Sequence, residues 1–213
     1  MTTLIVVRHG FSLSNAVRRY TGQSDVPLSP EGFAQAELVA DYLCAHLPPD
    51  VVVSSDLCRA VATVEPTARR LGLSVIPLPA LRETDVGEWT GRVYEEVCET
   101  DKELMARHRA DPSIPCPGGE STLQVFDRVT AAVRRLLDEH AGKTVLLATH
   151  AMPARCIECF AADHGVERIR DYKVAPNAAI HVYTFEDGRL RSAGPNIVSH
   201  LEKPGERLPS DLV

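Results

Sequence analysis

The segment Thr3-Leu4-Ile5-Val6-Val7-Arg8-His9-Gly10 decides the fold of this chain. Its apolar residues 4–7 are rich in β-branched side chains and are typical of a buried strand. Arg8, His9 and Gly10 follow at the carboxyl end of that strand, where open α/β sheets bind ligands. Arg8 can hold an oxyanion in its planar fork, and Gly10 permits a sharp turn. The segment therefore favours an anion site, although an ordinary Arg-His pair at a strand end would give the same pattern.

Three further segments place polar side chains at or just after the end of a strand. Further predicted strands, each with its closing residues, occupy residues 51–56, 75–78 and 145–150, and the first of these is expected to be buried. Arg59 lies in the first turn of the helix after the second strand, and Glu83 follows the third. The fourth strand ends on His150, as the first ends on His9. Two histidines, an arginine and a glutamate thus each lie at the end of a predicted strand or just after one.

Four motifs in this order resemble the histidine phosphatase superfamily, which has the phosphoglycerate-mutase-like fold. They are Arg8-His9-Gly10, Ser54-Ser55-Asp56-Leu57-Cys58-Arg59-Ala60, Leu81-Arg82-Glu83 and the strand-terminal His150. The resemblance covers nearly the whole chain. It implies an α/β three-layer sandwich, with helices on both faces of a mostly parallel central sheet and one antiparallel strand near the C-terminal edge. A hairpin pattern at residues 179–193, centred on Glu186-Asp187-Gly188, agrees with that edge.

The resemblance also implies roles for the candidate catalytic residues. Arg8, Arg59 and a partly protonated His150 would neutralise a phosphate monoester, and His9 would be the nucleophile. The sequence spacing alone does not show whether His9 or His150 is the nucleophile. Glu83 would protonate the leaving oxygen and then activate the water that hydrolyses the phosphohistidine. Neither a metal nor another cofactor is expected, because the cationic side chains do what Mg²⁺ does in other phosphate enzymes.

Candidate substrate-binding residues follow the two strand-terminal histidines. Ser12 and Asn15 match family positions that can bind phosphate oxygens, although both could equally cap a short helix. Thr21 and Gly22 belong to a loop that resembles the family loop contributing backbone groups to the phosphate pocket. Ala151 takes the place of the usual glycine and is similarly small.

Phe11 departs from the family pattern, which usually has Glu or Gln at this position. An aromatic ring at the rim of a phosphate pocket would favour esters with an apolar or aromatic leaving group. The alternative is that Phe11 turns inward and packs beneath the loop, which phenylalanine does more often than not.

Capping residues and apolar spacing predict two of the long helices. Ser29 before Pro30 caps a long helix, and Ser121 with Gln124 forms a capping box for another. Apolar residues at helical spacing predict the face of the first helix that packs on the sheet: Phe33, Ala36, Ala40, Leu43 and Leu47.

The domain organisation expected is one histidine phosphatase domain over residues 1–213. Within it, residues 84–120 are expected to form a polar, helical excursion that covers the active-site mouth. The tail from Asn196 onward is expected to pack on the surface or to be mobile.

Composition limits the partners and the location. The chain has 213 residues and a net charge of −6, which argues against a surface for nucleic acid or an anionic membrane. No secretory signal or membrane-spanning run is evident, and the six cysteines are scattered in the way typical of reduced thiols. The expected location is the cytoplasm, the expected partner is a small phosphorylated metabolite, and a homodimer is a further expectation.

A phosphatase is the predicted activity, with two alternatives. The family's glycolytic mutases carry a longer insertion after the acid residue, with a paired-arginine substrate clamp. Between Glu83 and His150 the first adjacent arginines are Arg134-Arg135, which lie in a predicted helix. A phosphoglycerate-type mutase is therefore the alternative within the enzymes. A catalytically idle phospho-ligand binding protein is the alternative of another class, and the retained catalytic residues argue against it.

Overall fold

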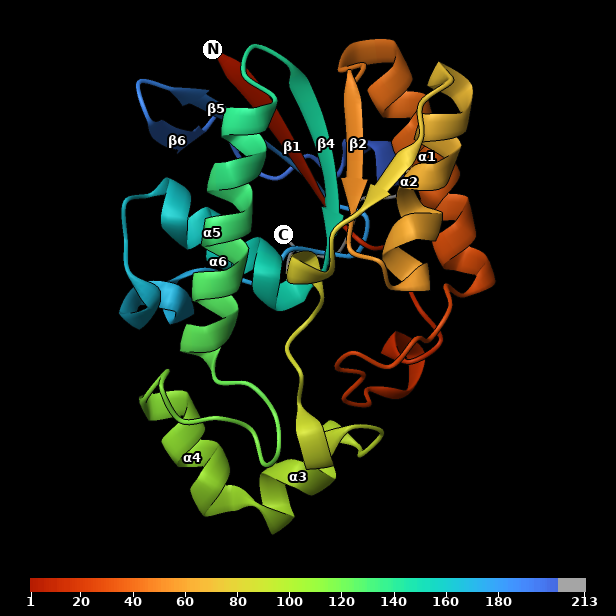
Figure 1. Cartoon of the computed structure of the whole chain (residues 1–213). Coiled ribbons are helices and arrows are strands. Elements are labelled where there is room, and N and C mark those ends of the chain that lie inside the picture. The colour runs from red at the N-terminus through yellow and green to blue at the C-terminus, as the bar shows by residue number, and fades with distance from the viewer. Residues whose placement is uncertain (203–213) are drawn as a thin grey trace.

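A central β-sheet carries the site residues, and it contains all four strands predicted before those residues. In the computed structural model, which describes residues 1–202, the sheet has six strands in the order β3-β2-β4-β1-β5-β6 (Figure 1). Their bounds are β1 Thr2–Arg8, β2 Val51–Ser54, β3 Val75–Pro77, β4 Thr144–Thr149, β5 Ile180–Glu186 and β6 Arg189–Ser192. The predicted strands before His9 and His150 lie side by side at the centre.

Strand direction agrees with the predicted mixed sheet. β1 pairs in parallel with β4, with Val6 opposite Leu147, and β4, β2 and β3 continue in parallel. β5 pairs antiparallel with both β1 and β6, so within residues 1–202 it alone runs against the other strands. The hairpin between β5 and β6 turns through Asp187 and Gly188, both at positive φ, as two-residue hairpins require. The fold prediction is confirmed.

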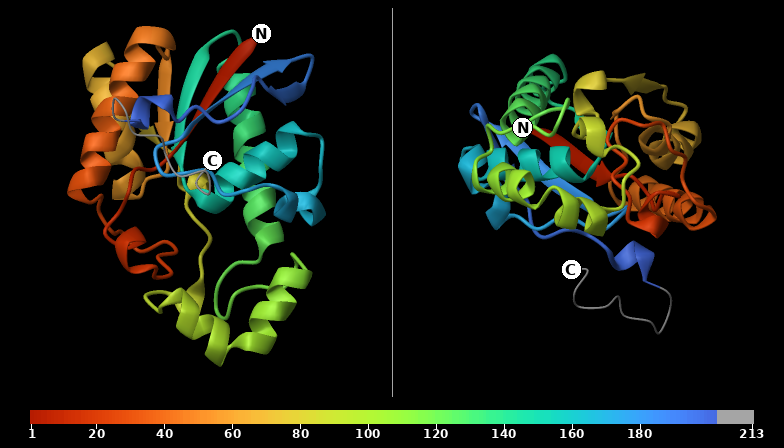
Figure 2. Two further views of the ribbon diagram at one scale, coloured as in Figure 1. Left: turned by 180° about the vertical axis from the view of Figure 1, so that it is seen from behind. Right: turned by 90° about the horizontal axis from the view of Figure 1, so that it is seen from below.

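Helices cover both faces of the sheet (Figure 2). Their bounds are α1 Pro30–His46, α2 Cys58–Leu71, α3 Tyr94–Thr100, α4 Lys102–Ala110, α5 Thr122–Glu139 and α6 Ala151–Ala161, with short 3₁₀ helices η1 Asn15–Val17, η2 Pro79–Leu81, η3 Gly87–Trp89, η4 Val166–Asp171 and η5 Ser199–Leu201. Along β1, Leu4 and Val6 pack with α5 and α6, whereas Ile5 and Val7 pack with α1 and α2. This alternation is the period of two that a sheet buried on both faces requires.

The helix caps are as predicted, but the buried face of α1 is not. Ser29 accepts the N–H of Gly32, and Ser121 with Gln124 forms the capping box. Phe33, predicted to face the sheet, is 52% exposed. The cause is Gly32, which lies against the backbone of Phe11 so closely that a Cβ there would stand 2.1 Å from the Phe11 carbonyl oxygen. This contact sets the rotation of α1, so the buried stripe starts at Gly32 and leaves Phe33 one residue off it.

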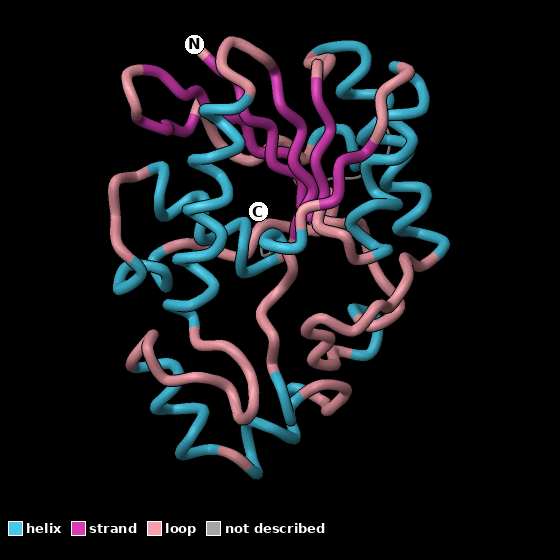
Figure 3. Tube along the Cα trace, viewed as in Figure 1, coloured by secondary structure: helices cyan, strands magenta, loops and turns pink. Residues whose placement is uncertain are grey.

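The loops that follow the parallel strands gather beyond the carboxyl ends of these strands (Figure 3). Beyond these loops lie α3 and α4, which belong to residues 84–120 (Figure 1). The segment has a small apolar cluster of its own, centred on Trp89, Val97 and Met105. Its helices therefore stand opposite the strand ends rather than on a face of the sheet.

The last described residues pack on the body of the protein. Ile197 exchanges backbone hydrogen bonds with Ile180, and η5 contacts α1. The rest of the prediction for the tail falls on residues 203–213, which lie outside the described residues. Within residues 1–202, no helix combines the length and the hydrophobicity needed to cross a membrane.

Candidate active site

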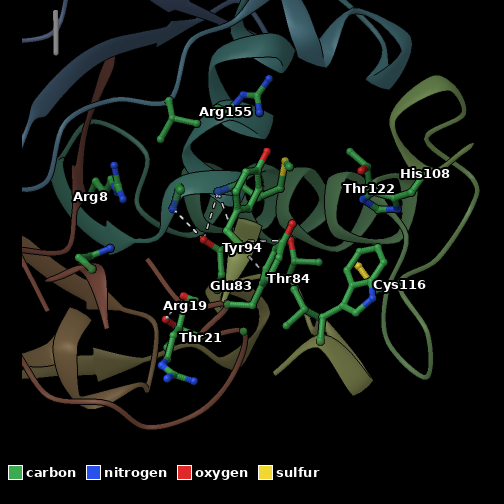
Figure 4. A pocket seen from close by; sticks show the side chains of 18 of the residues that line it. Arg8, Arg19, Thr21, Glu83, Thr84, Tyr94, His108, Cys116, Thr122 and Arg155 are labelled. Atoms are coloured by element: carbon green, nitrogen blue, oxygen red, sulfur yellow. Dashed lines mark hydrogen bonds between the residues drawn. The ribbon is translucent and has the colours of Figure 1, made fainter. Parts of the chain in front are cut away.

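A cavity of about 470 Å³ lies between the carboxyl ends of the strands and the 84–120 segment (Figure 4). Most predicted site residues line it: Arg8, His9, Asn15, Thr21, Gly22, Arg59, Glu83 and Ala151. Ser12 and His150 are not among its lining residues. The buried hydroxyl of Ser12 donates a hydrogen bond to Oδ1 of Asn15, so Ser12 supports that side chain from behind the cavity.

His9 presents one ring nitrogen to the cavity. Its Nδ1 lies 2.8 Å from the carbonyl oxygen of Gly10. Because a carbonyl only accepts, the proton sits on Nδ1 and the lone pair on Nε2. Burial, with the charges of Arg8 and Arg59, lowers the pKa of His9 to about 3. The ring is therefore neutral at physiological pH, with Nε2 available as a nucleophile.

His150 lies behind His9 and is fully buried. The two ring centroids are 5.1 Å apart, and Nε2 of His150 lies 2.8 Å from Oγ of Ser55. That hydroxyl accepts the N–H of Leu57 and can donate its own proton to Nε2, which leaves the ring proton on Nδ1. Nδ1 has no hydrogen-bond partner within residues 1–202.

Partial protonation of His150 was expected, and the unliganded structure corrects this expectation. Burial lowers the pKa of His150 well below its usual range, and the neighbouring His9, Arg59 and Arg8 lower it further. Neutral His150 can still donate a hydrogen bond from Nδ1, but the positive charge at the site comes from the arginines.

Arg8 and Arg59 are anchored by carbonyl oxygens rather than by carboxylates. Nη1 of Arg8 donates to the carbonyl of Ala175 at 2.5 Å. Arg59, only 1% exposed, donates to the carbonyls of Ser24 at 2.7 Å and Gly22 at 2.9 Å. Neither arginine forms an ion pair with an acidic side chain in the described part of the chain. Both positive charges therefore lack a direct acidic partner, although the charge of Glu83 acts on each of them, and the two guanidinium groups suit a phosphate dianion.

Two residues that the sequence analysis missed hold the His9 loop in place. Thr63, one helical turn after Arg59, accepts the N–H of Gly10 at 2.9 Å and donates to the carbonyl of Arg59 at 2.7 Å. Nδ2 of Asn177 donates to the carbonyl of His9 at 2.9 Å and approaches Oδ1 of Asn15 at 3.3 Å. The spacing of Thr63 from Arg59 on a predicted helix could have signalled the first, whereas nothing local signals Asn177.

Glu83 stands at the N-terminus of α6. Its carboxylate accepts the N–H groups of Thr84 at 2.8 Å and Ala151 at 3.0 Å, with Met152 at 3.3 Å. N–H groups from two parts of the chain thus fix the carboxyl group at the cavity wall, where a helix N-terminus favours negative charge.

The backbone of Glu83 is clamped by Arg128, another residue that the sequence analysis missed. Arg128 on α5 donates to the carbonyls of Glu83 at 3.0 Å and Ala80 at 2.8 Å, and it pairs with Glu120 at 2.7 Å. Glu120 in turn accepts the N–H of Asp85 at 2.8 Å. One ion pair therefore ties together both ends of the 84–120 segment and positions Glu83.

Arg128→Lys should lower turnover about tenfold while leaving KM nearly unchanged, because a small displacement of a catalytic group is costly. Lysine keeps the charge for Glu120 but cannot reach the carbonyls of Glu83 and Ala80 as the forked guanidinium does. Steady-state kinetics with thermal unfolding would check this. Arg135→Lys, on the same helix and in an exposed pair with Glu139, is the matched control and should change neither. Equal losses in the two variants would show that Arg128 has no positioning role.

Phe11 does not line the cavity, so its hypothetical contact with an apolar leaving group is not supported. Its carbonyl accepts the N–H and the hydroxyl of Ser29, and its N–H donates to Gln35. The half-buried residue instead joins the His9 loop to the start of α1.

The six cysteines are all unpaired, and Cys156 and Cys159 are both buried in α6. Burial raises the pKa of both thiols, to about 11 for Cys159. The pair therefore has the character expected of buried structural thiols rather than of a redox motif.

Known relatives resemble this chain over most of its length. The bifunctional protein Rv2228c of Mycobacterium tuberculosis is 38% identical over 164 residues, or 77% of this chain and 45% of that protein. The chain thus spans less than half the length of that relative. Phosphoglycerate mutase-like protein 4 of Arabidopsis thaliana is 34% identical over 95% of this chain and 88% of its own length. Phosphoserine phosphatase 1 of Hydrogenobacter thermophilus is 35% identical over 94% and 95%, respectively.

Solved structures and a family model agree with these relatives. A mycobacterial glucosyl-3-phosphoglycerate phosphatase, in a complex with VO3, superposes with a TM-score of 0.82 at 28% identity, covering 89% of this chain and 96% of that one. The family model described as the histidine phosphatase superfamily (branch 1) matches residues 4–198. With His9, Arg8, Arg59 and Glu83 at one cavity and His150 in contact with His9, the chain belongs to the histidine phosphatase superfamily.

Proposed function

We propose that this chain is a phosphatase that hydrolyses a small phosphate monoester through a phosphohistidine at His9. The observation that carries the proposal is the neutral His9 ring, whose free Nε2 faces a cavity that is also lined by Arg8 and Arg59. A nucleophile, a positive environment for the phosphate and a carboxyl group for proton transfer are thus present in one cavity.

The reaction proceeds in two displacements. Nε2 of His9 attacks phosphorus, the bond from phosphorus to the ester oxygen breaks, and Glu83 donates a proton to that oxygen. Water then enters, Glu83 removes its proton, and attack on phosphorus breaks the bond to His9 and releases phosphate. Arg8 and Arg59, which line the cavity, bind the phosphoryl oxygens and stabilise their charge in both transition states.

Glu83 must be protonated when the first leaving group departs. Its carboxyl group accepts backbone N–H groups in the unliganded protein. A bound phosphate dianion repels a neighbouring carboxylate, and a proton shared between the two removes that repulsion.

A phosphomutase remains the alternative activity, and the placement of the arginines favours the phosphatase. Arg134 and Arg135 lie in α5, where Arg135 pairs with Glu139 and neither lines the cavity. They form no substrate clamp of the kind expected in a mutase. Release of inorganic phosphate from a panel of phosphorylated metabolites tests the proposal. Isomerised esters without phosphate release would indicate the mutase, and binding without turnover would indicate the idle binding protein.

We also propose that residues 84–120 cover the active-site mouth within a single domain of residues 1–213. Trp89, Tyr94, Met105, His108 and Cys116 from this segment line the cavity opposite His9. A location in the cytoplasm, where the unpaired thiols would stay reduced, and a homodimer remain predictions.

Activity should survive an excess of EDTA, because arginines supply the positive charge that a metal would otherwise provide. Within residues 1–202, no group of three His, Cys, Asp or Glu side chains is placed to hold a metal. Turnover of p-nitrophenyl phosphate before and after chelation measures this. Loss of activity that added Zn²⁺ or Mg²⁺ restores would contradict it.

A further inference from the structure

The residues that lead into β5 reach the active site because β5 runs against its neighbours. β5 pairs antiparallel with β1, with Ile180 opposite Val7, so the residues just before Ile180 lie beside the carboxyl end of β1. Residues 175–178, here called the β5 lead, therefore stand next to Arg8 and His9, although the two parts are far apart in the sequence.

The β5 lead holds the end of β1 through backbone groups. The carbonyl of Ala175 accepts Nη1 of Arg8 at 2.5 Å, and the N–H of Ala178 donates to the carbonyl of Arg8 at 3.0 Å. Ala178 is fully buried and has a φ of 59°, in the left-handed region that a residue with a Cβ seldom adopts. Such a conformation persists only where the surrounding contacts impose it, and it is concentrated at functional sites. The lead is therefore held in one shape against the strand end that bears the nucleophile.

Asn177 carries the contact from the β5 lead to a side chain of the cavity. Its Nδ2 donates to the carbonyl of His9 at 2.9 Å, and it lies 3.3 Å from the carbonyl of Gly10 and from Oδ1 of Asn15. A carboxamide NH₂ group has two hydrogens, so one can serve the His9 loop while the other serves Asn15. Asn15 lines the cavity, whereas Asn177 does not. One NH₂ group thus joins the backbone of the nucleophile to a predicted substrate-binding residue.

The contacts of Asn15 determine which of its atoms can meet a phosphate group. Oδ1 of Asn15 accepts the N–H of Ser12 at 3.0 Å and the hydroxyl of Ser12 at 2.8 Å, in addition to the approach of Asn177. With these donors gathered on the oxygen, Nδ2 is the end of the carboxamide that remains for a phosphate oxygen. A donor held in this way is effective because it need not reorient during the reaction.

From these contacts we infer that Asn177 is a positioning residue, which couples the His9 loop to Asn15 and so aligns the nucleophile with a group that binds the phosphate. The inference rests on the proposed phosphatase activity and adds to it a residue outside the cavity. Asn177 acts on the alignment of the reacting groups, on which the rate of a displacement at phosphorus depends strongly.

Asn177→Asp should lower the rate constant for phosphorylation of His9 by about 10- to 100-fold at saturating p-nitrophenyl phosphate, because a small misplacement of a reacting group is costly. The substitution keeps the shape of the side chain but places an acceptor oxygen against the oxygens of His9, Gly10 and Asn15. Asn177→Ala removes the NH₂ group without adding an acceptor and should cost about tenfold. Rapid-quench labelling of His9 gives the rate constant per active site, and its amplitude gives the fraction of active sites.

Asn196→Asp is the matched control for these variants. Asn196 also follows a proline, makes the same charge change outside the cavity and precedes Ile197, which pairs with Ile180 of β5. The control should keep the wild-type rate constant. A rate constant per active site that stays at the wild-type value in both Asn177 variants, while only the amplitude or the melting temperature falls, would show a merely structural role and overturn the inference. An equal fall in the control would overturn it as well.

A double-mutant cycle with Asn15→Ala tests the coupling itself. If Asn177 acts through Asn15, the loss in the double variant should be smaller than the product of the two single losses by about threefold or more. Losses that simply multiply would overturn the inference. Hydrolysis by the wild type tests the phosphatase activity separately. Its absence would overturn that proposal, whereas wild-type activity that neither Asn177 variant reduces would overturn only the role of Asn177.

Discussion

His9→Asn should lower turnover by roughly 10⁴-fold or more, the scale of loss when the nucleophile of a covalent mechanism is removed. Asparagine can keep a hydrogen bond to the carbonyl of Gly10 but has no lone pair able to attack phosphorus. In the unaltered protein, brief incubation with labelled substrate and an alkaline quench should leave phosphate on the peptide that contains His9. Mass spectrometry of that peptide and single-turnover kinetics measure the two effects.

The control for this experiment is His46→Asn, an exposed histidine at the end of α1 and outside the cavity. It should retain full turnover and the label on His9. Label found only on Ser12 or Cys58 would contradict the mechanism, as would normal turnover by His9→Asn. Ser12 is the informative alternative, because its buried hydroxyl lies in the same loop as His9.

The sequence predicted the site well where a residue's place depends on its own strand. His9 and His150 end β1 and β4, and these strands are neighbours, so their predicted proximity needed only strand identity and sheet order. Arg59 follows β2 and Glu83 follows η2, at the same end of the sheet as the two histidines. The strands before His9, Arg59 and His150 are buried apolar runs, which the sequence pattern indicates directly.

Features that depend on distant contacts could not be predicted in the same way. Arg128 and Asn177 contact the site through carbonyl oxygens, which carry no sequence signal. The low pKa of His150 arises from burial by the assembled fold. The orientation of Phe33 depends on the approach of Gly32 to another loop, and apolar spacing alone cannot detect a shift of one residue.

Glu83→Gln should lower turnover by roughly 10²–10⁴-fold for alkyl phosphates, the usual range for general acid–base catalysis. An alkoxide is a poor leaving group and needs the proton that Glu83 supplies. Nitrophenolate leaves without a proton, so the loss on p-nitrophenyl phosphate should be much smaller in the phosphorylation step. The ratio of single-turnover rates on the two substrates therefore isolates proton donation from any general disturbance of the site.

That disturbance must be measured, because the carboxylate of Glu83 also accepts the N–H groups of Thr84 and Ala151. Glutamine can accept with its oxygen, but its NH₂ group faces donors that it cannot satisfy, which should lower the free energy of unfolding by about 1–3 kcal/mol. Glu88→Gln makes the same change at an exposed side chain in η3 and should alter neither stability nor turnover. Equal rate losses on both substrates would mean that Glu83 only maintains the structure of α6 and the cavity wall. A selective loss on alkyl phosphates, larger than the change in stability can explain, would instead assign the transferred proton to Glu83.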